Sequence, residues 1–196
     1  MDANQSDERY QAKDVKATLL SLKGEMGKPI LMRFRVQGAL HTSPDDVSTP
    51  AGVFTDYIVP LNQTTDSATF TLDSVELALY DFEVNFGTVL ETVPNTMTSD
   101  TGLATRDVAI TLNLKKQSIA TFDAFTKSRV GLKMPLELKL IDSSALYKGF
   151  RFYAPHYQQN KVPGLAAKGN FTQRQLGGKC IAETAGGEYL MEFGNV

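Results

Sequence analysis

The chain has 196 residues, of which 42% are hydrophobic, and its formal net charge at pH 7 is −2. This composition allows one core of good size in a single domain, and the balanced charge argues against the broad basic surface by which proteins grip duplex nucleic acid. The one cysteine, Cys180, excludes an intrachain disulfide framework and a Cys-rich zinc site, and it is typical of a protein made in a reducing cytoplasm.

The N-terminal segment, residues 1–14, is polar and lacks the apolar centre of a signal peptide. We expect it to be a flexible arm that becomes ordered only when a partner holds it. No apolar run in the chain approaches the roughly 20 residues that a membrane-spanning helix requires. The remaining residues, 15–196, are expected to form one domain.

Alternation of apolar and polar residues with period two is the pattern that repeats along this domain. A strand places successive side chains on opposite faces, so each run has one buried face and one wetter face. Burial on one face only is typical of antiparallel sheets, and the sequence therefore predicts a mainly β protein. The clearest runs are residues 30–37, 68–72, 108–114, 134–140 and 150–154.

Two connections follow the first strands. The stretch KGEMGK, residues 23–28, reads as the turn of a hairpin. Residues 41–65 form a long irregular segment with three prolines, and loops of this length in a compact domain are usually functional or disordered. Phe54, Tyr57 and Ile58 are too apolar for a free linker, so we expect this loop to dock on another surface.

The alternation changes phase within residues 75–86. Val75, Leu77 and Leu79 are apolar at odd positions, whereas the apolar residues from Tyr80 to Phe86 stand at even positions. One extra residue in a strand produces this change, so we expect a β-bulge or a sharp bend near Leu79. The alternative is a strand that leaves one sheet and joins another.

One segment has helical spacing instead. Ile119, Phe122 and Phe125 lie on one helical face, which predicts a short amphipathic helix over Ile119–Val130 covering one face or end of the sheets. Ser118 is expected to cap its start and Gly131 to end it. Asp123 and Lys127 stand four residues apart and would form an ion pair. Residues 93–104 and 160–170 read as exposed turns.

No pattern in the chain predicts catalysis, a metal site or a cofactor. His41 and His156 have no third histidine or CxxC to complete a zinc site, and both are expected to be ordinary surface or strand-end imidazoles. No G-x-S-x-G is present, and LGGKC lacks the earlier glycine of a phosphate loop. Cys180 reads as a small buried hydrophobe. We therefore expect no enzymatic activity.

Charged pairs on the predicted strands have two interpretations. Asp81 and Glu83 could perform acid–base chemistry, but their alternate positions favour a solvated or lumen-facing strand face. Arg33 and Arg35, with Arg151 on another strand, could bind an acidic partner. They are equally consistent with ordinary exposed strand residues, which the absence of a basic excess favours.

The order of these segments resembles the tail tube protein family of long-tailed, non-contractile bacteriophages. The resemblance spans about Leu19–Gly194 and depends on the order and spacing of the segments, so it assigns no role to any single residue. Four stretches carry it: LLSLKGEMGKPILMRFRVQGAL; LDSVELALYDFEVNFGTVLETVPN; TRDVAITLNLKK followed by the helix and MPLELKLID; and the closing YAPHYQQNKVPGLAAKGNFTQRQLGGKC with GGEYLMEFG.

The resemblance implies a structural virion protein. Its fold would be an antiparallel β-sandwich or barrel-like body with one short helix. Six copies would form a ring in which neighbouring sheets join around a lumen, and the rings would stack into a tube through which DNA passes without sequence-specific binding. Other implied partners are the tail terminator, tape measure and distal tail proteins, with assembly in the host cytoplasm and no membrane contact or cofactor.

This reading selects two loops as contacts between subunits or rings, Ser43–Val59 and Asn95–Ala104. The candidate contact residues in and near them are Asp45, Asp46, Val53, Phe54, Tyr57, Ile58, Asn95, Met97 and Asp100. Asp81 and Glu83 are expected on the lumen side or on another exposed strand face. Two other functions stay open: a tail terminator or neck connector that forms a single ring, and a carbohydrate-binding β-sandwich, which would normally expose tryptophans that this chain lacks.

Overall fold

A computed structural model describes residues 8–9, 12–40, 45–46, 68–94, 99–141, 149–184 and 186–194. Over these residues the protein is mainly β, with antiparallel strands and a single short helix, which confirms the predicted fold class. The elements are β1 (Glu8–Arg9), β2 (Ala12–Glu25), β3 (Leu31–Leu40), β4 (Asp45–Asp46), β5 (Ala68–Leu72), β6 (Val75–Glu76), β7 (Leu79–Asn85), β8 (Val89–Pro94), β9 (Ser99–Thr105), β10 (Ala109–Lys115), α1 (Ala124–Val130), β11 (Lys133–Ile141), β12 (Gly149–Gln159), β13 (Gly164–Lys168), β14 (Phe171–Cys180) and β15 (Leu190–Phe193).

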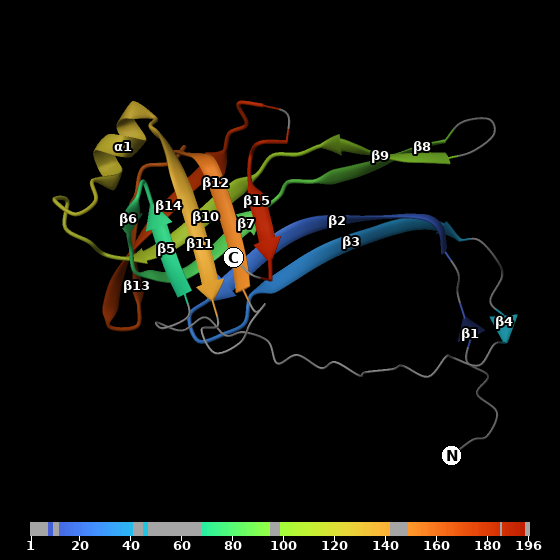
Figure 1. The fold of residues 1–196 in the computed structure, drawn as a ribbon, viewed down its shortest axis with the longest axis horizontal. Helices are drawn as coiled ribbons and strands as arrows, with labels where there is room; N and C mark the ends of the chain where they lie inside the picture. Colours follow the sequence, from blue (N-terminus) through green and yellow to red (C-terminus); the bar gives the residue numbers. More distant parts are fainter. Residues whose placement is uncertain are drawn as a thin grey trace, which may run out of the picture.

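The body consists of two layers joined at one corner (Figure 1). The long sheet contains β3, β2, β7, β10 and β14 in that order, with β13 added to β14. The short sheet contains β6, β5, β11 and β12, with β15 added to β12. The corner is β12, whose first residues pair with β15 and whose last three, Tyr157–Gln159, pair with β14.

The core fills the space between the two sheets. Strand β11 shows the expected alternation, because Met134, Leu136, Leu138 and Leu140 are buried while the residues between them are half-buried. Each apolar side chain of this size contributes about 1.5–3 kcal/mol when it is fully removed from water. The largest fully buried members are Tyr157, Phe86, Phe152, Leu22, Leu72, Ile110, Leu112 and Leu176.

The phase change near Leu79 has both of the expected causes. Asn113 pairs with Asp81 and Leu114 pairs with Leu79, which leaves Tyr80 as the extra residue of a bulge. The chain also changes sheets at this point, since β6 pairs with β5 in the short sheet while β7 joins the long sheet. The expectation of an irregularity near Leu79 is therefore confirmed.

The helix is shorter than the sequence suggested. It begins at Ala124 instead of Ile119, and its N-cap is Asp123 instead of Ser118. Asp123 accepts hydrogen bonds from the N–H groups of Phe125 and Thr126, both at 3.1 Å, whereas Ser118 closes a preceding turn. The better cap is the carboxylate, because it accepts two of the free N–H groups of the first turn.

Of the other expectations for the helix, the one for its end is confirmed and the one for its ion pair is wrong. Gly131 ends the helix in the left-handed conformation with φ 67°, as predicted. Lys127, however, pairs with Asp73 of the β5–β6 turn and not with Asp123, which is engaged as the cap. Of the predicted apolar face, Phe122 is buried, while Ile119 and Phe125 are exposed.

Two segments predicted as turns contain strands. Residues 99–105 form β9, which pairs with β8, and residues 164–168 form β13, which pairs with the start of β14. Both strands are rich in small or polar residues, so they show no apolar alternation that would reveal them. In addition, β2 begins at Ala12, inside the expected N-terminal arm, and β1 pairs with β4.

Candidate assembly surface

Two hairpins extend from the long sheet beyond the edge of the short sheet (Figure 1). One is β2–β3. The other is β8–β9, which continues β7 and β10 outward, so that each long strand pair has a body half and an arm half. We call the projecting parts of these hairpins the arms. The sequence predicted a strand at residues 30–37 but took β9 for a turn, and it gave no sign that these strands outrun the layer that covers them.

The β8–β9 arm departs from the body at Gly87. This residue has φ 55°, and a Cβ built on it would lie 2.4 Å from the carbonyl oxygen of Asp107. The N–H of Asp107 donates to the carbonyl of Phe86 at 3.3 Å, and the N–H of Gly87 donates to Asn85 Oδ1 at 3.0 Å. Only glycine fits this close approach without strain. A lone glycine inside a strand pattern is the sequence signal for it.

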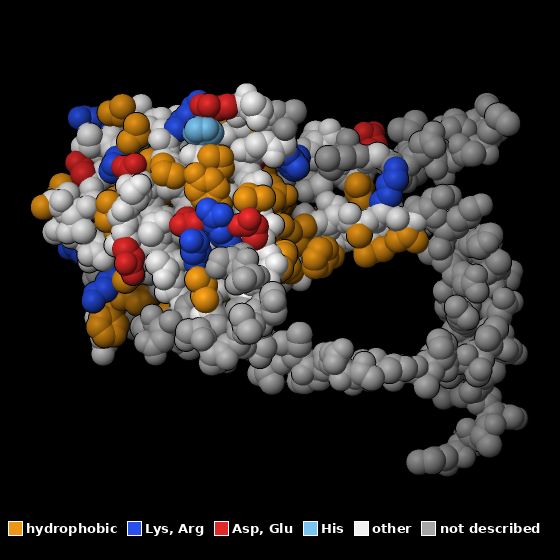
Figure 2. All heavy atoms as spheres, viewed as in Figure 1, with side chains coloured by type: hydrophobic (Ala, Val, Ile, Leu, Met, Phe, Trp, Pro, Cys, Tyr) orange, Lys and Arg blue, Asp and Glu red, His pale blue; other side chains and the backbone are white. Residues whose placement is uncertain are grey.

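The inner face of the β2–β3 arm is apolar and uncovered. Leu22 and Met32 stand opposite each other in the body and pack in the core. Farther out, Phe34 of the same face of β3 is 58% exposed and Val36 is 64% exposed. Figure 2 shows hydrophobic side chains continuing along this hairpin beyond the body. The expectation that the 30–37 run buries one face is therefore wrong for its outer half.

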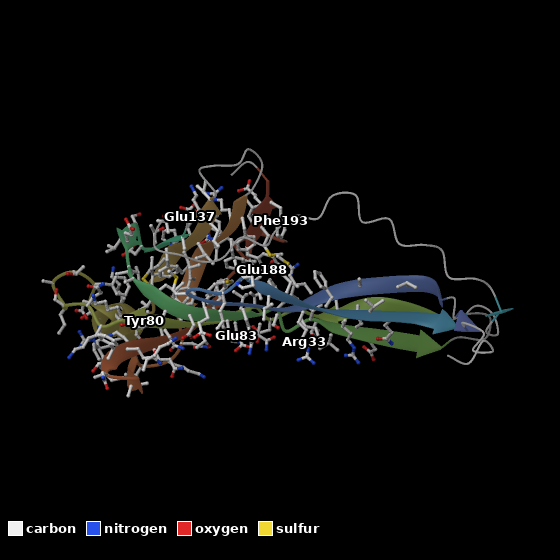
Figure 3. All side chains as sticks on the ribbon, turned by 90° about the horizontal axis from the view of Figure 1, so that it is seen from below. Arg33, Tyr80, Glu83, Glu137, Glu188 and Phe193 are labelled. Atoms are coloured by element: carbon white, nitrogen blue, oxygen red, sulfur yellow. The ribbon has the colours of Figure 1, made fainter. Side chains whose placement is uncertain are left out.

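The outer face of the long sheet is polar. Glu83 pairs with Lys23 at 3.0 Å across β7 and β2, and Asp81 pairs with Lys168 at 2.8 Å. Figure 3 shows Arg33 and Glu83 on the side of the long sheet that faces away from the short sheet. Asp81 and Glu83 thus lie on the outer face of the long sheet, where their lysine partners leave both half-buried.

Positive and negative side chains on this outer face neutralise one another in ion pairs. The hydrogen bond from Lys28 lowers the pKa of Glu25, and the hydrogen bond to Asp81 raises the pKa of Lys168. Glu25, Lys28 and Asp81 border an open groove of about 430 Å³ together with Thr111 and Asn113. Because positive and negative groups alternate here, the described residues of this face form no uninterrupted basic track for a nucleic acid backbone.

The arms end in open strand edges. Among the described strands, β3 pairs only with β2, and β9 pairs only with β8. The N–H and C=O groups on the outer sides of β3 and β9 are therefore available to another chain, and such edges are templates for further strand pairing. The two edges lie on opposite sides of the pair of arms.

A cleft marks the fork where the two arms separate. The Thr88 hydroxyl donates to the carbonyl of Leu19 at 3.3 Å, which joins β2 to the start of the β8 arm. Beyond it lies an open cleft of about 360 Å³, lined by Ala17, Leu90 and Tyr189 among others. Arg106 also lines it, with its guanidinium 5.7 Å from the Tyr189 ring centre.

The predicted contact residues fall mostly outside the described part of the chain. This holds for Val53, Phe54, Tyr57, Ile58, Asn95 and Met97. The backbone of Asp45 and Asp46 forms β4, and that of Asp100 lies in β9 opposite Val93. Nothing described of their side chains bears on a contact between subunits.

The described residues provide little for catalysis. No three His, Cys, Asp or Glu side chains among them gather to hold a metal ion. Cys180 is buried, and this burial raises the pKa of its thiol to about 12. His156 Nε2 lies 3.4 Å from Glu183 at the surface, and His41 lies outside the described residues. A thiol so rarely ionised is a poor nucleophile.

Comparison with models of known protein families finds no match to the chain, and comparison with curated proteins finds none. No helix in the described ranges is long and apolar enough to cross a membrane. The features of the described residues that bear on function are therefore the two-faced long sheet, its open edges and its arms.

Proposed function

We propose that this protein is a structural subunit of a virion tail tube, which assembles into six-fold rings that stack around a lumen. The observation that supports this most is the long sheet with its arms: a polar outer face, an uncovered apolar inner face on the β2–β3 hairpin and an open strand edge on each side. Such a layer completes its hydrogen bonding and burial when copies stand side by side.

The strand directions suit closure of a ring. Strands β3 and β7 both run antiparallel to β2, so they share one direction, and β8 continues β7. Strand β9 runs antiparallel to β8 and hence antiparallel to β3. The β3 edge of one copy can therefore pair with the β9 edge of the next in an antiparallel ladder, which would remove both edges around a closed ring.

The two faces of the long sheet fit the two sides of such a ring. The polar outer face, with its paired charges around Glu83 and Lys23, would line the lumen, and the apolar inner face, with Phe34 and Val36, would turn toward protein. DNA would pass a surface that neither grips nor reads it. Catalysis is not required for this role, and the tape measure, terminator and distal tail proteins would be further partners in the virion.

Electron microscopy of the purified full-length chain tests the proposal. We expect hollow tubes built from stacked rings. Single rings that never stack would support a terminator or neck connector instead. A chain that stays monomeric at high concentration would overturn the proposal, because the arms would then need no second copy.

Disulfide trapping tests the edge pairing separately. We expect cysteines placed along β3, such as Gln37→Cys, to crosslink between copies with cysteines placed along β9, such as Thr101→Cys. The native Cys180 is buried, so it contributes little background. As a control, Gln37→Cys combined with a cysteine on the outer face of the short sheet, Lys139→Cys, should give no crosslink between neighbours in a ring.

A further inference from the structure

The end of the body opposite the arms is where α1 and the β13–β14 hairpin lie (Figure 1). It carries a second group of exposed apolar side chains. Val162 is 80% exposed and Leu165 is 58% exposed. The Ser128 hydroxyl donates to the carbonyl of Lys161 at 3.1 Å, which fixes α1 beside this loop. We call this surface the α1 end; its exposed apolar residues are Ile119, Phe125, Val130, Val162, Leu165 and Phe171.

A buried arginine without a counter-charge lies beneath the α1 end. Arg174 of β14 is only 6% exposed, and its Nε and Nη1 atoms have no hydrogen-bond partner. Its guanidinium stacks 5.1 Å from the centre of the Phe125 ring. In the described part of the chain, no carboxylate lies within ion-pair distance of it. A buried guanidinium with free donors favours a carboxylate ligand, which can accept two hydrogen bonds at once.

The surrounding surface is also basic. Lys115, Lys116 and Lys161 are exposed, and no described carboxylate lies within 4.0 Å of their ammonium groups. The nearby carboxylates of Asp73 and Asp123 are already engaged, one with Lys127 and the other as the helix cap. The α1 end therefore combines apolar area with positive charge that has no local partner.

The segment that begins at the opposite end of the molecule has the complementary composition. It follows Leu40, the last residue of β3, which lies at the arm tip far from α1 (Figure 1). Residues 41–67, the acidic segment, contain Asp45, Asp46, Asp56 and Asp66 but no lysine or arginine. Apolar and aromatic residues stand among these acids, namely Val53, Phe54, Tyr57 and Ile58.

We propose that the α1 end binds the acidic segment of a second copy of this chain, head to tail, with an aspartate accepting hydrogen bonds from Arg174. The apolar side chains of the segment pack on Phe125, Val162 and Leu165. Because the two contact surfaces are different, the contact is heterologous, and it repeats along an axis when its rotation does not close a ring. The inference rests on the proposed tube to the extent that this contact would join one ring to the next.

Sedimentation velocity of the full-length Arg174→Met variant tests the arginine. We expect axial association to weaken about tenfold or more, since charged anchors at the centre of an interface commonly have effects of that size. The dilute monomer should melt no lower than wild type, because an unpaired buried charge has been replaced by an apolar side chain. Lys179→Met, on the outward face of the same strand, is the control and should associate like wild type.

A mixing experiment tests the head-to-tail geometry. The second variant replaces the acids, Asp45→Asn, Asp46→Asn and Asp56→Asn, and keeps the α1 end intact. Neither variant should grow axially alone, but a mixture should form one head-to-tail contact and then stop. Val162→Asp, at a fully exposed site, provides a second means of blocking the α1 end if Arg174→Met fails to fold.

The outcomes separate this inference from the proposed function. Wild-type tubes together with normal tubes from both variants would overturn the inference and leave the tube proposal standing. A monomeric wild type with no axial association would overturn both. A mixture that never associates, with each variant monomeric, would also overturn the inference, since it would show that the segment of one copy does not bind the α1 end of another.

Discussion

The body half and the arm half of the β2–β3 hairpin have the same sequence pattern and opposite environments. In the body half, Leu22 is fully buried beneath the short sheet, opposite Met32. In the arm half, Val36 continues the same face of β3 and is 64% exposed. The alternation specifies which face of a strand is apolar, but the cover for that face can come from the same chain or from another.

Removal of a covered side chain should have the largest effect on stability. We expect Leu22→Ala to lower the free energy of unfolding by about 2–5 kcal/mol, because it leaves a cavity between well-packed sheets. Urea denaturation of the monomer measures the change. Leu31→Ala is the matched control, since Leu31 lies on the neighbouring strand and is 66% exposed. Its cost should stay within about 0.5 kcal/mol, and equal costs for the two variants would contradict the assigned burial.

The next largest effect on stability is expected from a substitution at Gly87, where the body and the β8–β9 arm meet. We expect Gly87→Ala to destabilise the protein by about 1–3 kcal/mol, because the added Cβ clashes with the carbonyl of Asp107 and the positive φ is strained. Thermal unfolding measures it. The control is Gly102→Ala in the β9 arm, where no atom lies within 4 Å of an added Cβ. A Gly87→Ala protein as stable as wild type would show that this junction is not as tight as described.

A smaller effect is expected at the helix that closes the α1 end. Hydrogen bonds from the hydroxyl and N–H of Thr126 lower the pKa of Asp123 below its ordinary value of 3.8. The contribution of this cap to stability is therefore present above about pH 4 and is lost as the pH falls through the lowered pKa. Asp123→Asn keeps a capping oxygen, so it should match wild type at pH 7 and show a weaker loss between pH 7 and pH 3. Asp123→Ala should be less stable at pH 7, and identical acid profiles for Asn and wild type would contradict the assignment.

The sequence predicted the elements well where residues alternate clearly and poorly where they do not. The runs at 108–114 and 134–140 became β10 and β11, and the phase change near Leu79 became a bulge at Tyr80. Strand β13 was missed, because its small residues pair through the backbone and bury little.

The candidate surface was harder to foresee than the fold. Exposure of Phe34 depends on how far the short sheet reaches, and this depends on strands distant in the sequence. The isolation of Arg174 likewise depends on which carboxylates fold near it. Arg174 was not singled out from the sequence, although it shares the alternation of Leu176 and Cys180 in β14. Local patterns specify faces and turns, whereas tertiary distances decide which groups stay without a partner.

The last test removes the uncovered side chains and has the smallest expected effect on the monomer. Phe34→Thr with Val36→Thr keeps residues that favour strands, so the free energy of unfolding should change by less than about 1 kcal/mol. Assembly should fail, because burial of these side chains against another copy would contribute about 1.5–3 kcal/mol each. Stability and assembly are measured separately. If the free energy of unfolding of the double variant falls by several kcal/mol, the arm face is covered by its own chain. If the double variant assembles normally, the arms are not the surface that joins the copies. Only loss of assembly with an intact monomer agrees with the proposed role of this face, in which the body half packs in its own core and the arm half packs against a neighbouring copy.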